Sequence, residues 1–238
     1  MLSASDFFEW ETTSLAMLFE GVVYVWEVLQ QINPWLETLL DTPCSSDNRR
    51  QGMIQPGAFV GEDVFLAPGS VVESGAYIKG PAYVGEGSII RHGAYLREGS
   101  IVGNHCVVGH ASEVKASILL DGSAAPHFNY VGDSILGQHC NLGAGVKLSN
   151  VKHTKDEITV KYRNEYYPTG RVKLGAILGD GVALGCNSVC NPGTLIGPRT
   201  LVYPNASLRG FYPADSIIKV VIATQIEPRI PIGKQEPS

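Results

Sequence analysis

The stretch IQPGAFVGEDVFLAPGSVVESGAYIKGPAYV, residues 54–84, carries a medium-sized aliphatic residue at every sixth position. The spacing continues without exception to residue 120. Its members are Ile54, Val60, Leu66, Val72, Ile78, Val84, Ile90, Leu96, Val102, Val108, Val114 and Leu120. Mostly small residues such as Ala58, Ser70 and Ala76 follow four positions later, so both positions are expected to point inward. A fixed period of this kind predicts a solenoid, in which each unit buries its apolar face against its neighbours.

The hexad changes phase after Leu120. It slips by four residues and resumes at Tyr130, which predicts a loop over residues 121–129. The later members are Tyr130, Leu136, Leu142, Leu148, Val172, Leu178, Leu184, Cys190, Ile196, Val202 and Leu208. The sequence thus predicts an all-β solenoid that is interrupted twice.

The second interruption lies between Leu148 and Val172, where the hexad is lost. Ile158, Val160 and Tyr162 alternate there with polar residues. An alternation with period two is typical of a half-buried strand, so we expect a projecting hairpin.

The first part of the chain lacks the hexad and has apolar residues at helical spacing, which predicts a helical cap. These residues are Val25, Leu29, Ile32 and Leu36, with Pro34 as a break. The expected organisation is a helical region with a linker (1–50), a β-helix (51–220) with an insertion at 149–171, and a C-terminal tail (221–238).

Composition restricts the partners and the compartment. The net charge is −5 and no long cationic run is present, so nucleic acid is not an expected partner. The apolar stretch over residues 15–28 contains Glu20 and Glu27 and has no basic leader, so we expect neither a signal peptide nor a membrane span. The odd number of scattered cysteines fits a reducing cytoplasm.

The cysteines are not expected to bind metal. Cys106, Cys140 and Cys190 fall on inward positions and are interpreted as small buried hydrophobic residues. Cys186 faces outward, and its spacing to Cys190 is not a convincing zinc pattern. No metal requirement is expected.

Two columns of outward residues recur at eighteen-residue spacing, the length of one three-sided coil. Phe59, Tyr77 and Tyr95 are expected to stack as an aromatic strip that the cap or another subunit covers. The second column contains Lys79, Arg97 and Lys115, in coils about 4.8 Å apart. Like charges at this spacing repel unless an anion or acidic neighbours offset them. The column is therefore either a phosphate site or a solvated column paired with Glu98 and Glu113.

His127 lies in the segment Ala125–Tyr130, at the change of phase, and is expected on a loop that leaves the wall of the solenoid. Imidazole titrates near neutral pH and can take a proton from an attacking amine. A single histidine on a loop is more often structural or merely exposed.

The segment His127-Phe-Asn-Tyr130-Val-Gly-Asp133, followed by Asn141-Leu-Gly-Ala-Gly145, resembles a known family. It is similar to the acetyltransferase domain of bacterial N-acetylglucosamine-1-phosphate uridyltransferases and of archaeal bifunctional sugar-1-phosphate nucleotidyltransferases. The resemblance is strong over residues 95–150. It implies a left-handed parallel β-helix, a homotrimer with sites between adjacent prisms, and acetyl-CoA as co-substrate for N-acetylation of an amino-sugar 1-phosphate.

The resemblance also implies roles for individual residues. His127 matches the general base, and Asn150 matches a residue near the reacting amine and thioester. The residues that match sugar-phosphate positions are Arg97, Lys115, Tyr130 and Asn141, to which the charge column adds Lys79. The residues near the coenzyme A groove, by position in the coils, are Cys186, Pro204 and Lys219.

The sequence departs from the family in two respects. Val151 and Asp156 stand where fused bacterial enzymes have a tyrosine and a phosphate-binding lysine, and Lys152 or Lys155 is a candidate substitute. The glycine-rich loop of the nucleotidyltransferase domain is absent, so this chain alone is not expected to make a sugar nucleotide.

Two other functions compete with acetyl transfer. The altered positions keep open a non-catalytic module that binds a sugar phosphate or serves assembly. A zinc carbonic anhydrase on the same helix type is a third reading, suggested by His105 and His110. These two residues occupy different positions of their hexads, and no third histidine lies where that site requires one.

Overall fold

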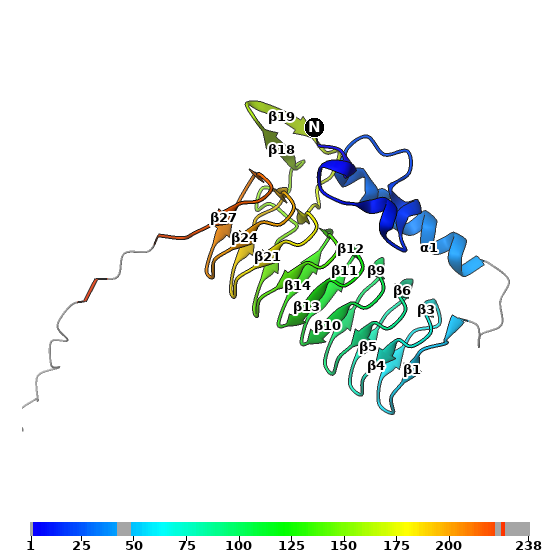
Figure 1. Cartoon of the computed structure of the whole chain (residues 1–238). Helices are drawn as coiled ribbons and strands as arrows, with labels where there is room; N and C mark the ends of the chain where they lie inside the picture. The colour runs from blue at the N-terminus through cyan, green and yellow to red at the C-terminus, as the bar shows by residue number, and fades with distance from the viewer. Residues whose placement is uncertain (1, 42–48, 222–224, 227–238) are drawn as a thin grey trace, which may run out of the picture.

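The described part of the chain folds into a long three-sided prism of parallel coils. A computed structural model describes residues 2–41, 49–221 and 225–226. It confirms the predicted all-β solenoid, a left-handed parallel β-helix with an N-terminal helical cap and a projecting hairpin (Figure 1). Each complete coil places one strand in each of three sheets. We name these sheets face 1, face 2 and face 3, in the order in which a coil visits them.

The strands of each face follow one another coil by coil. Face 1 contains β1 (Met53–Ile54), β4 (Val71–Val72), β7 (Ile89–Ile90), β10 (Val107–His110), β13 (Ala124–His127), β16 (Asn141–Leu142), β21 (Ala183–Leu184), β24 (Leu201–Val202) and β27 (Ile217–Ile218). Face 2 contains β2 (Phe59–Val60), β5 (Tyr77–Ile78), β8 (Tyr95–Leu96), β11 (Glu113–Lys115), β14 (Tyr130–Gly132), β17 (Lys147–Leu148), β22 (Val189–Cys190) and β25 (Ser207–Leu208). Face 3 contains β3 (Val64–Leu66), β6 (Ala82–Val84), β9 (Ser100–Val102), β12 (Ser117–Leu119), β15 (Ile135–Leu136), β20 (Ala176–Leu178), β23 (Thr194–Ile196) and β26 (Phe211–Tyr212).

The prism interior is the apolar core that the hexad predicts. Leu66, Val84 and Val102 are fully buried and stand opposite one another in β3, β6 and β9. Cys106, Cys140 and Cys190 are buried in the same core. Burial raises the pKa of the Cys106 thiol to about 11 and those of Cys140 and Cys190 to about 12. These three thiols therefore stay protonated at neutral pH.

The change of phase has a different cause from the one expected. Two corners are one residue shorter than the others, so the inward position passes from Val114 to Leu119 and from Val131 to Leu136. Ala116 and Asp133, with φ of 44° and 47°, turn the chain at these corners in the left-handed region. The predicted loop over residues 121–129 is wrong, because β13 and the start of the turn to β14 lie there.

Three predicted inward residues are corrected by this register. Leu120 is buried beneath the N-terminal region instead of inside the prism, and Val131 rather than Tyr130 fills the next interior position. Val172 is 55% exposed, in the segment that returns from the insertion. The sequence could not reveal the first two shifts, because Leu119 and Leu120, like Tyr130 and Val131, are adjacent apolar residues that fit the pattern equally well.

The N-terminal cap consists of short 3-10 helices and one α-helix. These are η1 (Ala4–Asp6), η2 (Trp10–Thr12), η3 (Ala16–Phe19), η4 (Val25–Gln30) and α1 (Ile32–Asp41). The cap packs on face 3, where the outward side chains of Ile101, Ile118 and Ile135 are apolar and fully buried (Figure 1). Pro34 does not break the helix as expected, since it lies in the first turn of α1, where a missing N–H costs little.

Two carboxylates fasten the cap to the prism. Asp121 accepts hydrogen bonds from Thr13 Oγ1 at 3.0 Å and from the Ser14 backbone at 2.9 Å. Asp180 accepts one from the Glu9 backbone at 2.7 Å, and burial raises the pKa of its carboxyl.

The insertion forms the expected hairpin of β18 (Thr159–Tyr162) and β19 (Glu165–Pro168). Ile158 and Val160 are fully buried in the cluster that also holds the cap, and Tyr167 packs edge-on against Tyr24 at 5.9 Å. None of the helices in the described ranges has the length and apolarity of a bilayer-crossing segment.

Candidate functional site

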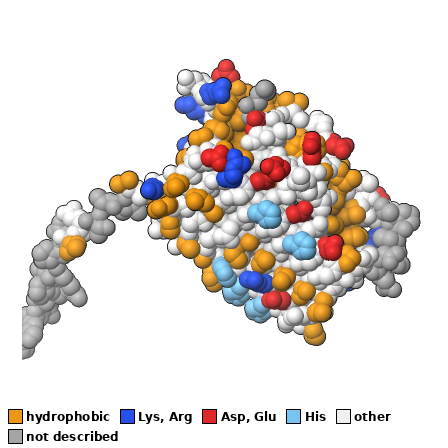
Figure 2. Space-filling model, viewed as in Figure 1, with side chains coloured by type: hydrophobic (Ala, Val, Ile, Leu, Met, Phe, Trp, Pro, Cys, Tyr) orange, Lys and Arg blue, Asp and Glu red, His pale blue; other side chains and the backbone are white. Residues whose placement is uncertain are grey.

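The predicted site residues lie along two different edges of the prism. The edge between faces 1 and 2, which we call the histidine edge, holds one corner residue from each successive coil. In order these are His92, His110, His127, Ala144, Cys186 and Pro204. The edge between faces 2 and 3, which we call the cation edge, holds Lys79, Arg97, Lys115, Asp133 and Asn150. Side chains of histidine and of both charges are visible on the prism in Figure 2.

His127 is the last residue of β13, and its exposed side chain stands on the histidine edge. The expectation that His127 lies on a loop leaving the wall is wrong, because β13 pairs directly with β10. Its backbone N–H donates to Asn129 Oδ1 at 3.0 Å, which fixes the corner. Among the described residues, none bonds to its ring nitrogens, so the imidazole is free to meet a ligand.

The neighbouring histidines of this edge are held by the backbone. His110 Nδ1 lies 2.9 Å from the carbonyl oxygen of His92, and the two rings stack at 5.6 Å. Cys186 and Pro204 are exposed two and three coils beyond His127 on the same edge. The Lys219 ammonium lies 5.5 Å from the centre of the Tyr203 ring, next to Pro204.

The cationic column does stack, and its charges are paired within the chain. Lys79 forms an ion pair with Glu98, and Arg97 Nη1 donates to Glu113 Oε1 at 3.0 Å. That hydrogen bond to Glu113 is the main reason why the pKa of Arg97 is raised. The side chains of these pairs are 34% to 53% exposed, so water screens the pairs and an incoming anion can compete for the cations.

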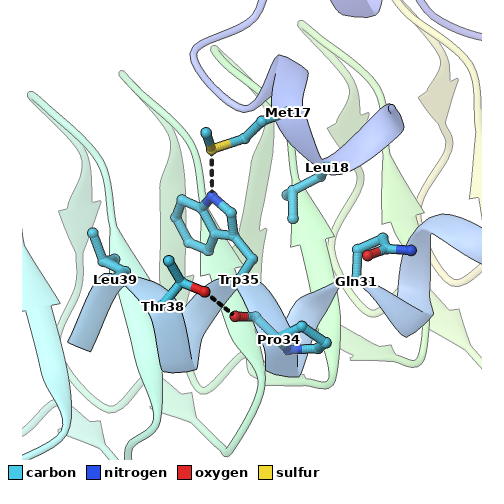
Figure 3. Close-up of a pocket in the computed structure, with 7 residues that line it drawn as sticks. All are labelled: Met17, Leu18, Gln31, Pro34, Trp35, Thr38 and Leu39. Atoms are coloured by element: carbon cyan, nitrogen blue, oxygen red, sulfur yellow. Dashed lines mark hydrogen bonds between the residues drawn. The ribbon is translucent and has the colours of Figure 1, made fainter. Parts of the chain in front are cut away.

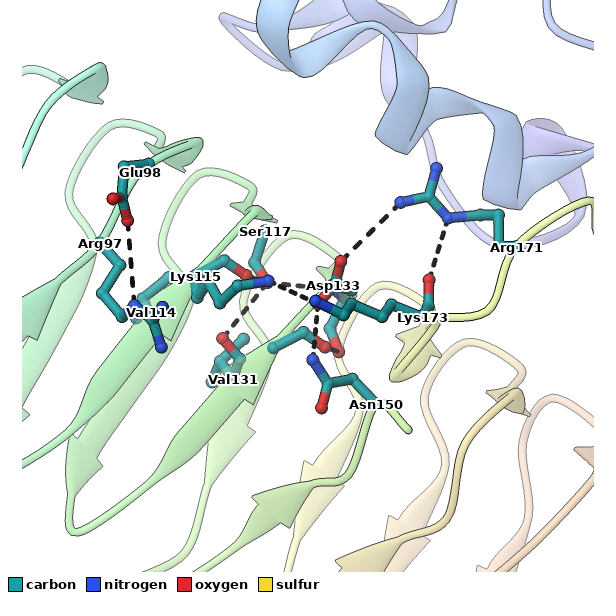
Figure 4. A network of polar contacts seen from close by, with 12 residues as sticks. Arg97, Glu98, Val114, Lys115, Ser117, Val131, Asp133, Asn150, Arg171 and Lys173 are labelled. Atoms are coloured by element: carbon teal, nitrogen blue, oxygen red, sulfur yellow. Dashed lines mark hydrogen bonds and ion pairs between the residues drawn. The ribbon is translucent and has the colours of Figure 1, made fainter. Parts of the chain in front are cut away.

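Lys115 belongs to a more buried network, drawn in Figure 4. Its ammonium lies 3.1 Å from Asp133 Oδ2, and the same oxygen accepts a hydrogen bond from Asn150 Nδ2 at 2.6 Å. Arg171 Nη2 lies 3.9 Å from the other carboxylate oxygen. Burial lowers the pKa of the Arg171 guanidinium, and the charge of Asp133 partly opposes that shift.

Tyr130 joins the network from β14. Its hydroxyl lies 3.5 Å from Asn150 Oδ1, and burial is the main cause of its raised pKa. Gly132 is necessary for this approach, because a Cβ there would lie 2.7 Å from the Tyr130 hydroxyl and 2.9 Å from Asn150 Nδ2. Because its pKa is raised, the Tyr130 phenol stays protonated at neutral pH and can donate a hydrogen bond.

Within one chain the predicted residues do not converge on a single point. Lys115, Tyr130 and Asn150 lie together at the cation edge, while His127 lies on the opposite edge of face 2. Asn141 is exposed on face 1, in β16.

Two residues of the network received no role from the sequence. Asp133 could have been found, because it is an acidic residue eighteen positions after Lys115, at the end of the family-like segment. Arg171 gave no local signal, because it follows the insertion and reaches the cation edge only in the folded chain.

Other candidate residues lie elsewhere. His105 is at the corner between faces 3 and 1 and His110 at that between faces 1 and 2. In the described ranges no three His, Cys, Asp or Glu side chains are grouped so as to hold a metal ion. Lys152 pairs with Asp156 at 3.5 Å and, with Arg209, lines a cleft beyond Asn150.

A further hollow lies in the cap (Figure 3). It is lined mainly by apolar groups, and the Trp35 indole N–H points at Met17 Sδ from 2.8 Å. None of the predicted site residues lines it.

The chain is similar in sequence to a domain family and to parts of longer curated proteins. A family model described as the GMPPB C-terminal domain matches residues 78–199, just over half of the chain. A bifunctional sugar-1-phosphate nucleotidylyltransferase/acetyltransferase of Sulfurisphaera tokodaii is 39% identical over 94 residues, which cover 40% of this chain and 23% of that protein. The bifunctional protein GlmU of Methanococcus aeolicus is 31% identical over 119 residues, covering 48% and 29%.

The chain thus spans about a quarter of the length of these curated relatives. Among solved structures, an Arabidopsis UDP-N-acetylglucosamine acyltransferase is similar with a TM-score of 0.40 and 12% identity, over 70% of each chain.

Proposed function

The chain belongs to the GMPPB C-terminal domain family, and from this premise we propose that it is an acetyl-CoA-dependent N-acetyltransferase of an amino-sugar 1-phosphate. The observation that carries the proposal is that the family match, residues 78–199, includes Arg97, Lys115 and His127 in one continuous block of coils. The catalytic unit in this proposal is the β-helix of residues 51–220 with its insertion at 149–171, working in the cytoplasm.

The separation of the two edges supports a site built between copies of the chain. Face 2 lies between the histidine edge and the cation edge. If three parallel prisms turn face 2 toward a common axis, the histidine edge of one copy lies beside the cation edge of the next. The exposed aromatic strip of Phe59, Tyr77 and Tyr95 on face 2 is then covered as well.

In this arrangement His127 takes a proton from the sugar ammonium, which frees the amine to attack the thioester carbonyl. The carbon–nitrogen bond forms, the carbon–sulfur bond breaks, and coenzyme A leaves as the thiol after protonation. Asn150 lies near the reacting groups, and backbone N–H groups stabilise the developing oxyanion. Cys186, Pro204 and Lys219, further along the histidine edge, contact the coenzyme.

The sugar phosphate binds at the cation edge. Arg97 exchanges Glu113 for a phosphate oxygen, and Lys115, whose ammonium has three N–H donors, binds a phosphate oxygen while it keeps Asp133. Tyr130 donates a hydrogen bond, Asn141 comes from the neighbouring face, and Lys79 extends the positive potential.

A turnover assay with acetyl-CoA and glucosamine 1-phosphate tests the proposal, with release of the free thiol as the readout. The second candidate is a non-catalytic module that binds a sugar phosphate, and the altered Val151 and Asp156 favour it. Binding of glucosamine 1-phosphate without any acetyl transfer from the tested donor establishes that second function.

We expect a homotrimer in solution. The predicted site residues of one chain are divided between two edges, and the aromatic strip on face 2 remains exposed in a single copy. Sedimentation equilibrium at micromolar concentration measures the mass directly. A monomer under these conditions contradicts both the trimer and the shared site.

Arg97→Ala and Lys115→Ala should each weaken binding of the sugar phosphate by about ten- to a hundredfold, because each removes a charge-assisted hydrogen bond. Binding of acetyl-CoA, measured by calorimetry on the same proteins, should change little. Equal losses for both ligands reject the assignment of the cation edge to the phosphate. Arg199→Ala, which removes a cation paired with Asp215 on another edge, is the control for general charge effects.

A further inference from the structure

We infer that Asp133 is a positioning residue, which holds Lys115 and Asn150 in the geometry that acetyl transfer requires. The inference rests on the proposed function for its catalytic consequence, and on the geometry of the network for the positioning itself.

The Asp133 carboxylate is the centre of the cation edge. Its side chain is only 6% exposed, and one oxygen lies 3.1 Å from the Lys115 ammonium and 2.6 Å from the Asn150 amide. Neither side chain is free to turn without losing this bond. Tyr130 is linked to the same carboxylate through Asn150. One carboxylate thus orients three residues of the proposed site.

The backbone places the carboxylate with little freedom. Asp133 has a φ of 47°, its N–H donates to the Lys115 carbonyl at 2.9 Å, and its own carbonyl accepts from Gly175 at 2.8 Å. An aspartate tolerates this left-handed conformation better than most residues. The short corner at Asp133 therefore directs its carboxylate toward Lys115 and Asn150.

Arg171 keeps the network positive. Two cations face one carboxylate, so the group carries a net charge of +1 and Lys115 can still attract a phosphate. Arg171 comes from the segment that returns from the insertion, which ties the hairpin to the site. Asp133 keeps both Lys115 and Asn150 in place while the phosphate is bound.

Asp133→Asn removes the charge and keeps the shape. With wild-type activity as the reference, kcat should fall about ten- to a hundredfold, because displacement of a catalytic group by about 1 Å costs this much. The KM for glucosamine 1-phosphate should change by less than about threefold, since Arg97 and Lys115 both keep their positive charge. In an Asn150→Ala background the same substitution should cause no further loss of kcat, because Asp133 acts through Asn150.

Asp121→Asn is the matched control. Asp121 is also a corner carboxylate and accepts bonds from Thr13, Ser14 and the Asn104 backbone, but it fastens the cap at another edge. It should lower the melting temperature and leave kcat unchanged.

Crystal structures of wild type and Asp133→Asn separate this inference from the proposed function. Displaced Lys115 and Asn150 side chains support positioning even if wild type shows no acetyl transfer, a result that would reject only the proposed function. Side chains that stay in place overturn the inference. So do an unchanged kcat in an active enzyme, or a loss that is additive with Asn150→Ala.

Discussion

His127→Ala should reduce acetyl transfer by about 10² to 10⁴ in kcat, the usual effect of losing a positioned general base. The trimer and its melting temperature should stay nearly unchanged, because the side chain is exposed on the histidine edge and its truncation opens no cavity in the core. The loss should shrink as the pH rises, since more of the sugar amine is then deprotonated without help. Initial rates over a range of pH, with sedimentation of the same samples, measure both effects.

His110→Ala provides the comparison. His110 occupies the same edge one coil earlier and is equally exposed, but it has no place in the proposed chemistry. It should keep near-normal turnover. Near-normal turnover of His127→Ala at neutral pH means that the proposed mechanism is wrong, and loss of activity together with loss of the trimer means that His127 acts structurally.

Val131→Asp should destabilise the fold by at least about 4 kcal/mol, because it buries an unpaired carboxylate inside the prism. Val131 is fully buried in the core of the prism. Its neighbours there, Val114 and Leu148, offer no partner for a charge. Urea unfolding followed by circular dichroism gives the free energy, or reveals that the protein does not fold.

Val107→Asp is the same chemical change on an outward position of face 1. It should cost no more than about 1 kcal/mol, because water can hydrate the new carboxylate. The hexad by itself places Tyr130 in the interior at this coil, so similar costs for the two aspartates would show that the register described here is wrong.

The regular part of the prism could be predicted because its cause is local and repeated. Every inward residue from Ile54 to Val114 obeys the six-residue spacing, and the hairpin alternation at Ile158 and Val160 is equally local. The short corners at Ala116 and Asp133 were not predictable in this way. Leucine is available at both Leu119 and Leu120, so the pattern cannot distinguish the residue that faces the prism from the one that faces the cap.

The residues of the candidate site could also be predicted from local spacing, but their arrangement in space could not. The eighteen-residue column of Lys79, Arg97 and Lys115 and the family-like segment around His127 can be read from the chain, because coil length converts spacing into stacking. Their assignment to opposite edges of face 2 cannot be read, since it depends on which corner each coil has reached.

The amino-acid sequence therefore suffices for the solenoid, its interior from periodic burial, and the residue types of the site. Three-dimensional packing was needed for the rest: the cap on face 3, the shortened corners, and the meeting of Lys115, Asp133 and Arg171. The physical reason is that Arg171 is separated from Asp133 by a whole hairpin. Such contacts form only when the insertion packs against the cap and returns its chain to the prism.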